Sequence, residues 1–161
     1  MKTEIYKLSA LELSEAYKNK TLSPVEATYS VLERIKNIDE KLNAYVFIDE
    51  DLAISQAKKS EIRWNKGNQK SNIDGVPTAI KDLLLTKGWP TLRGSKTVNK
   101  NLEWKDDAPV TARLKESGAV LIGKTTTPEF GHKGTTQSPL TGITRNPWNI
   151  ELTSGGSSGG S

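Results

Sequence analysis

The sequence has no cysteine and a single histidine among its 161 residues. Without cysteine the chain can form neither a disulfide framework nor a thiolate metal site, and this composition fits a reducing compartment. No hydrophobic run approaches the length that would cross a membrane, and the first residues lack the apolar stretch of a secretory signal peptide. We therefore expect a cytoplasmic protein.

Charge of one sign is not concentrated anywhere in the chain. The 23 Lys and Arg residues are interleaved with 19 Asp and Glu residues, which leaves a net charge of +4. A nucleic-acid-binding arm or a polybasic membrane patch would need clustered basic residues, so we expect direct binding to neither. The chain does have 34% hydrophobic residues, including four Trp, which is enough for the core of one folded domain.

The N-terminal part is predicted to be helical. Ser9 and Ser23 are each followed three residues later by a glutamate, which is the capping-box arrangement, and Pro24 occupies the first helical position after the second cap. These signals predict a helical hairpin. A third helix is expected from Asp51 to about Lys66, followed by a polar loop.

The pattern changes at about residue 73. Gly75–Ile80 is a short apolar run after a turn signal, and an expected helix over Ala108–Ser117 leads through Gly118 into the apolar run Ala119–Ile122. Apolar strands alternating with helices indicate an α/β fold with a sheet covered by helices on both faces. We expect residues 1–161 to belong to one domain, with 1–72 as a helical flank and 73–161 as the start of the α/β core.

One motif is a coincidental match. Gly118–Thr125 fits the P-loop pattern G-x-x-x-x-G-K-[ST], which binds nucleotide phosphates. In a P-loop, however, the strand precedes the first glycine and a helix opens at the Gly-Lys-Thr. Here the four central residues are themselves the expected strand, so we predict no nucleotide site and interpret Gly118 as a helix C-terminal residue.

Lys81 follows the first apolar run and allows two interpretations. It is either a surface lysine at a strand end or a desolvated amine at the carboxyl edge of the sheet, with a pKa low enough to act as a base. The neighbouring Asp82 either pairs with this amine or points to the other side and bonds the backbone.

Gly155–Ser161 also allows two interpretations. Its composition is that of a flexible linker, yet it directly follows the aromatic-bearing stretch Ser138–Asn149. The glycines can equally provide unusual backbone conformations, or a close approach to a ligand, with hydroxyl groups between them.

Taken together, these segments resemble the amidase signature family, whose members hydrolyse or transfer amides with a Ser/cis-Ser/Lys triad. The resemblance covers essentially the whole chain. Besides the entry helices, its marks are Leu42–Val46, Gly75–Asp82, Ser117–Thr125 with Pro128–Gly131, Thr144–Asn149 and Gly155–Ser161. It implies a mixed central sheet, of which this chain holds the N-terminal part, and it implies no cofactor.

The resemblance also implies roles for two residues. Lys81 corresponds to the catalytic base and Ser157 to the cis-peptide serine, which relays the proton, so a cis bond is expected between Gly156 and Ser157. Gly155, Gly156 and Ser158 would support this geometry. The family usually has proline where this chain has Ser154, which puts the rigidity of the loop in doubt.

The nucleophilic serine of the family lies about two dozen residues beyond the cis-serine, outside this sequence. The resemblance thus implies an N-terminal fragment of an amidase that acts on small-molecule amides, and we predict that the fragment alone hydrolyses nothing. The stretch Gly134–Ile143 favours a stand-alone amidase. The alternatives are the A subunit of an aminoacyl-tRNA amidotransferase, which would bring tRNA and a partner subunit, and a truncated module that only binds.

Three further residues invite a functional interpretation. His132 is expected to be a loop residue, because no cysteine or acidic cluster stands at metal-ligand spacing from it. Glu129 fits the first turn of a helix. Trp148 is placed near the site only by the family resemblance.

Overall fold

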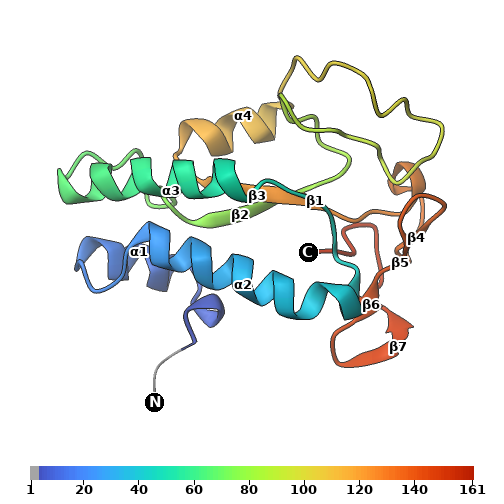
Figure 1. Cartoon of the computed structure of the whole chain (residues 1–161), viewed down its shortest axis with the longest axis horizontal. Coiled ribbons are helices and arrows are strands. Elements are labelled where there is room, and N and C mark those ends of the chain that lie inside the picture. The colour runs from blue at the N-terminus through green and yellow to red at the C-terminus, as the bar shows by residue number, and fades with distance from the viewer. Residues whose placement is uncertain (1–3) are drawn as a thin grey trace. The chain divides into compact units, whose positions relative to one another are not determined.

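The computed structural model describes residues 4–161. Their contacts define two compact units. Among the described residues, the first unit comprises those up to Asn37 together with Asp49–Thr78 and Arg113–Ile122, and the second comprises Ile38–Ile48, Ala79–Ala112 and Gly123–Ser161. The elements are traced along the chain in Figure 1.

The first unit is mainly helical, as the capping signals predict. After a short 3-10 turn, Ile5–Lys7, come α1 over Ala10–Lys18, α2 starting at Pro24 and ending at Leu42, and α3 over Glu50–Asn65. Ser9 forms a full capping box with Glu12, and the Glu26 N–H donates to Ser23 Oγ at 3.1 Å. Helix α3 begins one residue before the expected Asp51, because Asp49 caps it by accepting from the Leu52 N–H at 3.0 Å.

The core of the first unit forms between α1, α2 and the segment that enters β2. Leu13, Tyr17, Ala27 and Val76 are buried together. The rings of Tyr17 and Trp64 meet edge to face with centroids 5.9 Å apart. Burying such side chains stabilises the fold by about 1.5–3 kcal/mol each.

A three-stranded mixed sheet has the order β1-β3-β2, formed by Tyr45–Ile48, Val120–Thr125 and Pro77–Lys81. Strand β1 runs antiparallel to β3. Strands β2 and β3 run parallel, since the Val120 N–H donates to Val76 O and, further along both strands, the Asp82 N–H donates to Thr125 O. The mixed α/β class is confirmed. Strand β1 lies within residues 1–72, where the sequence analysis foresaw only helices.

The segment that matched the P-loop pattern is a helix-to-strand connection. Helix α4 covers Pro109–Glu116, and Gly118 follows it with φ +85°, as a glycine that ends a helix does. Strand β3 then continues through Gly123 and Lys124 to Thr125, with all six residues buried. No helix opens at the Gly-Lys-Thr, which agrees with the prediction that this is no P-loop.

The second unit carries two small hairpins (Figure 1). Strand β4, Gln137–Ser138, pairs with β5, Gly142–Ile143, and β6, Arg145–Asn146, pairs with β7, Asn149–Thr153. Before them, Glu129–Gly131 forms only a 3-10 turn. None of these short strands was predicted.

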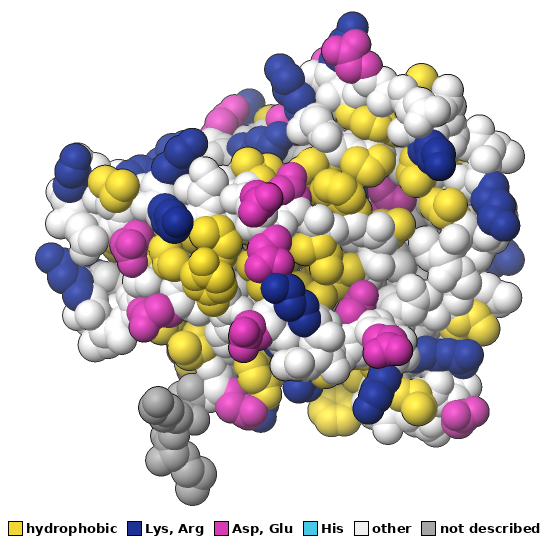
Figure 2. All heavy atoms as spheres, viewed as in Figure 1, with side chains coloured by type: hydrophobic (Ala, Val, Ile, Leu, Met, Phe, Trp, Pro, Cys, Tyr) yellow, Lys and Arg dark blue, Asp and Glu magenta, His cyan; other side chains and the backbone are white. Residues whose placement is uncertain are grey.

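The surface seen in Figure 2 mixes acidic and basic side chains, with hydrophobic ones between them, and no large area of one charge sign is visible on that face. Among residues 4–161, no helix combines the length and the hydrophobicity that crossing a membrane requires.

Candidate active site

Lys81 and Ser157 meet in the second unit although they are 76 positions apart in the sequence. Lys81 is the last residue of β2, and its Nζ donates a hydrogen bond to Ser157 Oγ at 2.8 Å. Both residues are partly buried. An amine in contact with a hydroxyl group is the arrangement that a Ser-Lys type of proton relay needs.

The glycine-rich segment around Ser157 is an ordered loop. The peptide bond between Gly156 and Ser157 is cis, as predicted, and Gly155 has φ +87°. The Ser157 carbonyl oxygen accepts a hydrogen bond from Thr127 Oγ1 at 3.2 Å. Ser158 is exposed, and its carbonyl accepts the Ser161 N–H at 3.3 Å. The linker interpretation of Gly155–Ser161 does not describe this structure.

Two glycines of the loop are required by close packing. A Cβ atom on Gly159 would lie 1.9 Å from Thr136 Oγ1, and one on Gly160 would lie 2.0 Å from the Ala44 carbonyl oxygen. The Gly160 N–H also donates to Thr126 O at 3.4 Å. The loop therefore packs closely against Thr136, Ala44 and Thr126, and larger residues at these two positions would push it away.

Ser154 stands where the family usually has proline. Its backbone N–H donates to Thr144 O at 3.0 Å, a hydrogen bond that proline could not make. The loop entrance is thus fixed by a hydrogen bond where a proline would fix it by its ring.

Asp82 does not pair with Lys81. Asp82 lies in the turn after β2, and its carboxylate is buried, with Oδ1 3.8 Å from Lys124 Nζ and accepting the Leu92 N–H at 3.2 Å. Of the two alternatives that the sequence left open, the structure shows the second. Burial lowers the pKa of the Lys81 amine, with no acidic group acting against this shift.

Lys124 contacts the turn after Lys81, although no sequence motif singled it out. Its side chain is fully buried, and Nζ donates to Leu84 O at 2.6 Å and to Thr91 Oγ1 at 2.9 Å. Burial lowers its pKa to about 8. The sequence did hold a signal for this residue, because Lys124 is a charged residue just after the apolar run Ala119–Ile122. Only the structure shows what its side chain contacts.

The other candidate residues are not part of this contact. His132 is exposed in the turn after Gly131, as a loop residue. Glu129 begins the 3-10 turn and accepts a hydrogen bond from Ser95 Oγ at 2.8 Å. Trp148 is 94% exposed at the tip of the β6–β7 hairpin.

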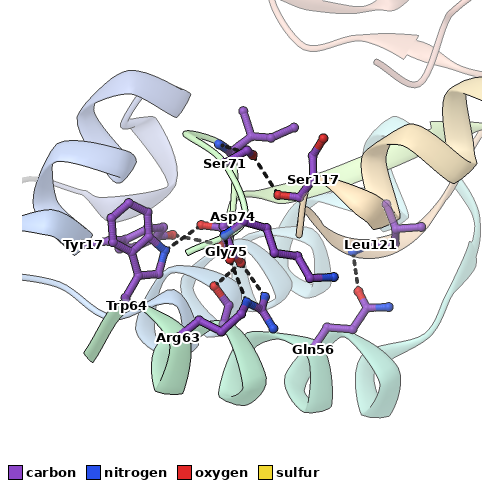
Figure 3. A network of polar contacts seen from close by, with 12 residues as sticks. Tyr17, Gln56, Arg63, Trp64, Ser71, Asp74, Gly75, Ser117 and Leu121 are labelled. Carbon is purple, nitrogen blue, oxygen red and sulfur yellow. Dashed lines mark hydrogen bonds and ion pairs between the residues drawn. The ribbon is translucent and has the colours of Figure 1, made fainter. Parts of the chain in front are cut away.

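A separate polar network, in the first unit, is centred on the fully buried Asp74 (Figure 3). Arg63 binds both carboxylate oxygens, with Nε 2.7 Å from Oδ2, and Ser60 donates to Oδ1 at 2.7 Å. The Trp64 indole N–H donates to the Asp74 carbonyl at 2.9 Å. Through these contacts Asp74 is a structural centre that ties α3 to the entry of β2.

Comparisons with known proteins identify the family and the fold. The Amidase family model matches residues 26–161. A bacterial aryl acylamidase of the amidase signature enzymes has a solved structure that superimposes with a TM-score of 0.92, at 34% identity, over 98% of this chain and 33% of that chain. The peptide amidase from Stenotrophomonas maltophilia gives a TM-score of 0.88 at 27% identity, over 96% of this chain and 33% of its own.

The fold is that of a family of amide-bond enzymes. The chain belongs to the amidase family, the amidase signature enzymes. Among curated proteins, it is 40% identical over 161 residues to the A subunit of the glutamyl-tRNA(Gln) amidotransferase of Thermobifida fusca (strain YX). The alignment covers 99% of this chain and 32% of that protein, so the chain spans about a third of the length of its relatives.

Proposed function

We propose that this chain supplies the base and the proton relay of an amidase that cleaves the carbon–nitrogen bond of small-molecule amides. The observation that carries the proposal is the 2.8 Å contact between Lys81 Nζ and Ser157 Oγ, made by an amine without an acidic partner. A lysine acts as a base only in its neutral form, and burial favours that form.

The proton path follows from these two groups. An attacking hydroxyl group within hydrogen-bonding distance of Ser157 Oγ passes its proton to that oxygen while the Ser157 proton passes to Lys81 Nζ. The hydroxyl oxygen then bonds to the amide carbonyl carbon. On collapse of the tetrahedral intermediate, the ammonium of Lys81 returns the proton through Ser157 to the leaving nitrogen. The carbon–nitrogen bond breaks, the amine leaves, and the acyl group stays on the attacking oxygen as an ester. Water then passes a proton through Ser157 to Lys81 while its oxygen adds to the ester carbon. When the ester bond breaks, the proton returns through Ser157 to the departing oxygen and the acid is released.

The attacking hydroxyl group belongs to a serine that the family resemblance puts beyond residue 161. We propose that Gly155, Gly156 and Ser158 support the relay by fixing the backbone on both sides of Ser157. A cytoplasmic location without a cofactor is part of the same proposal. This proposal includes no role for tRNA; the amidotransferase alternative described next does.

The second candidate function is the A subunit of an aminoacyl-tRNA amidotransferase. The observation in its favour is the identity of 40% and 41% to the A subunits from Thermobifida fusca and Geotalea daltonii. The same lysine and serine would then release nitrogen from a donor amide for transfer to glutamyl-tRNA, and a partner subunit would be required. The sequence of Gly134–Ile143 favoured the stand-alone amidase.

The test is a chimera in which residues 1–161 replace the segment of the aryl acylamidase on which this chain superimposes, which is 33% of that chain. The chimera is expected to hydrolyse acyl anilides. Lys81→Met and Ser157→Ala should each lower kcat by about 10²–10⁴-fold, the scale of losing an acid–base group.

Lys133→Met is the matched control, because it removes an exposed lysine from the loop before β4. It should retain activity within about twofold, the range of a surface change. A chimera that folds and keeps full activity with Met at position 81 would contradict the proposal. Copurification of the chain with the other amidotransferase subunits of Thermobifida fusca would favour the second candidate.

A further inference from the structure

A fully buried lysine lies under the turn that follows Lys81. Lys124 has 0% of its side chain exposed and stands in the central strand β3. Lysine is almost never fully buried unless its charge has partners. Here the partners are the Leu84 carbonyl at 2.6 Å, the Thr91 hydroxyl at 2.9 Å and Asp82 Oδ1 at 3.8 Å.

Two of these three contacts lie in the turn directly after Lys81. Asp82 and Leu84 belong to the turn that begins where β2 ends, and the Leu84 N–H donates to the Lys81 carbonyl at 3.0 Å. The ammonium group thus connects the Lys81 turn to the loop that contains Thr91. Burial lowers the pKa of Lys124, and the negative charge of Asp82 raises it.

Asp82 is the acid closest to Lys81 in sequence, yet it does not influence the Lys81 amine. Burial raises the pKa of the Asp82 carboxyl, and Lys124 together with the backbone N–H groups of Leu92–Gly94 acts in the opposite direction. A carboxylate released from these partners would find the Lys81 amine on the adjacent residue. An ion pair there would favour the protonated amine and remove its capacity to act as a base.

We propose that Lys124 is a positioning residue for Lys81: it holds the Asp82 carboxylate and the Leu84 carbonyl beneath the turn, so that Asp82 cannot pair with the Lys81 amine. The inference rests on the proposed function of Lys81 as the base. On this inference, Lys124 touches neither Ser157 nor substrate, yet it keeps the Lys81 amine neutral.

The experiment measures the pKa of individual lysines in the chain. Trace acetic anhydride labels neutral amines, and peptide mass spectrometry then gives the labelling rate of each lysine between about pH 7 and pH 11, the range in which lysines titrate. Native chain is compared with Lys124→Met, Asp82→Asn and the double variant. Lys87→Met, which removes an exposed lysine from the same turn region, is the control.

In Lys124→Met, the pKa of Lys81 is expected to rise by about one unit, which lowers its labelling at pH 8 about tenfold. Asp82→Asn and the double variant should leave Lys81 within about twofold of native labelling, because an amide cannot form the competing ion pair. This pattern, in which the second substitution reverses the first, is not expected of a lysine that only fills space.

A folded Lys124→Met chain with unchanged Lys81 labelling would overturn the inference. If Lys124→Met fails to fold, the double variant decides, since it leaves no unpaired buried charge. Low Lys81 labelling in the double variant would then overturn the inference, and native labelling would support it. An ordinary Lys81 pKa in the native chain would instead contradict the proposed function on which the inference rests.

Discussion

At the scale of single residues, Asp74 is the best-connected buried side chain of the first unit. It joins Arg63 and Ser60 of α3 and also accepts the backbone N–H of Lys70 at 2.8 Å. Asp74→Asn should lower the free energy of unfolding by about 3 kcal/mol, because it leaves a partly buried guanidinium without its anion. Urea denaturation measures this, with the exposed Asp106→Asn as a control that should change little.

The same carboxylate makes stability depend on acid pH. Burial by itself would raise the pKa of Asp74, but Arg63, Lys70 and Ser60 bind the charged form and bring the pKa below the usual 3.8. The stabilisation is therefore present above pH 3.8 and is lost as the pH falls through the lower pKa of the folded state. Asp74→Asn should flatten this acid slope, and an unchanged slope would show that other carboxylates cause it.

The lowered pKa of Lys81 predicts the pH dependence of the reaction. Because burial favours the neutral amine, the fraction of active base rises with pH through a pKa below 10.5. The kcat of the chimera should rise with pH along a limb set by that pKa. A kcat that does not change with pH below 10.5 would argue that Lys81 is not the base.

At the scale of elements, the loop Gly155–Ser161 depends on close packing against Ala44 and the backbone after β3. Gly160→Ala should lower the kcat of the chimera on the order of 10²-fold, the cost of shifting a catalytic group by about 1 Å. Its Cβ would lie 2.0 Å from the Ala44 carbonyl and 2.8 Å from the Thr126 nitrogen.

Gly134→Ala is the matched control, since nothing lies within 4 Å of the Cβ that it adds. Full activity of Gly160→Ala would contradict the prediction, because it would mean that Ser157 keeps its position without the close packing at residue 160. The labelling rate of Lys81 would show this independently of turnover.

The helices could be predicted because their signals are local. Ser9 and Ser23 cap helices whose start is determined by the four residues that follow, and Gly118 ends α4 through its own backbone conformation. Strand β1 was missed because its four residues become a strand only by pairing with β3, whose partner residues lie 75 to 80 positions away. The two-residue strands β4, β5 and β6 are likewise defined by their partners and not by a sequence pattern.

The site was predictable to the same extent. Lys81 and the cis bond before Ser157 followed from the family resemblance, and the structure brings the two side chains to hydrogen-bonding distance. The partner of Asp82 could not be predicted, because Lys124 is 42 positions away and a buried lysine contradicts the ordinary preference of its type. Sequence patterns predict the environment that is common for each residue type, and a fully buried lysine beside a buried aspartate is uncommon.

At the scale of the whole molecule, the chain covers about a third of each relative, with 32% of the Thermobifida fusca protein aligned. The predicted consequence is that purified chain hydrolyses neither acyl anilides nor simple amides, since Lys81 and Ser157 need an attacking hydroxyl group. The measurement is product release over days at high protein concentration. Lys81-dependent hydrolysis by the chain alone would contradict the assignment of the nucleophile to a later segment.

The enclosure of Lys124 also has a practical consequence for proteolysis. Trypsin cleaves after lysine and arginine, of which the chain has 23, but it must seat an extended and accessible backbone. Lys124 lies within a strand of which every residue is buried. A cut after this residue therefore records the opening of β3, while cuts at exposed lysines record only surface access. The rate at which the tryptic fragment ending at Lys124 accumulates thus measures how often the central sheet unfolds.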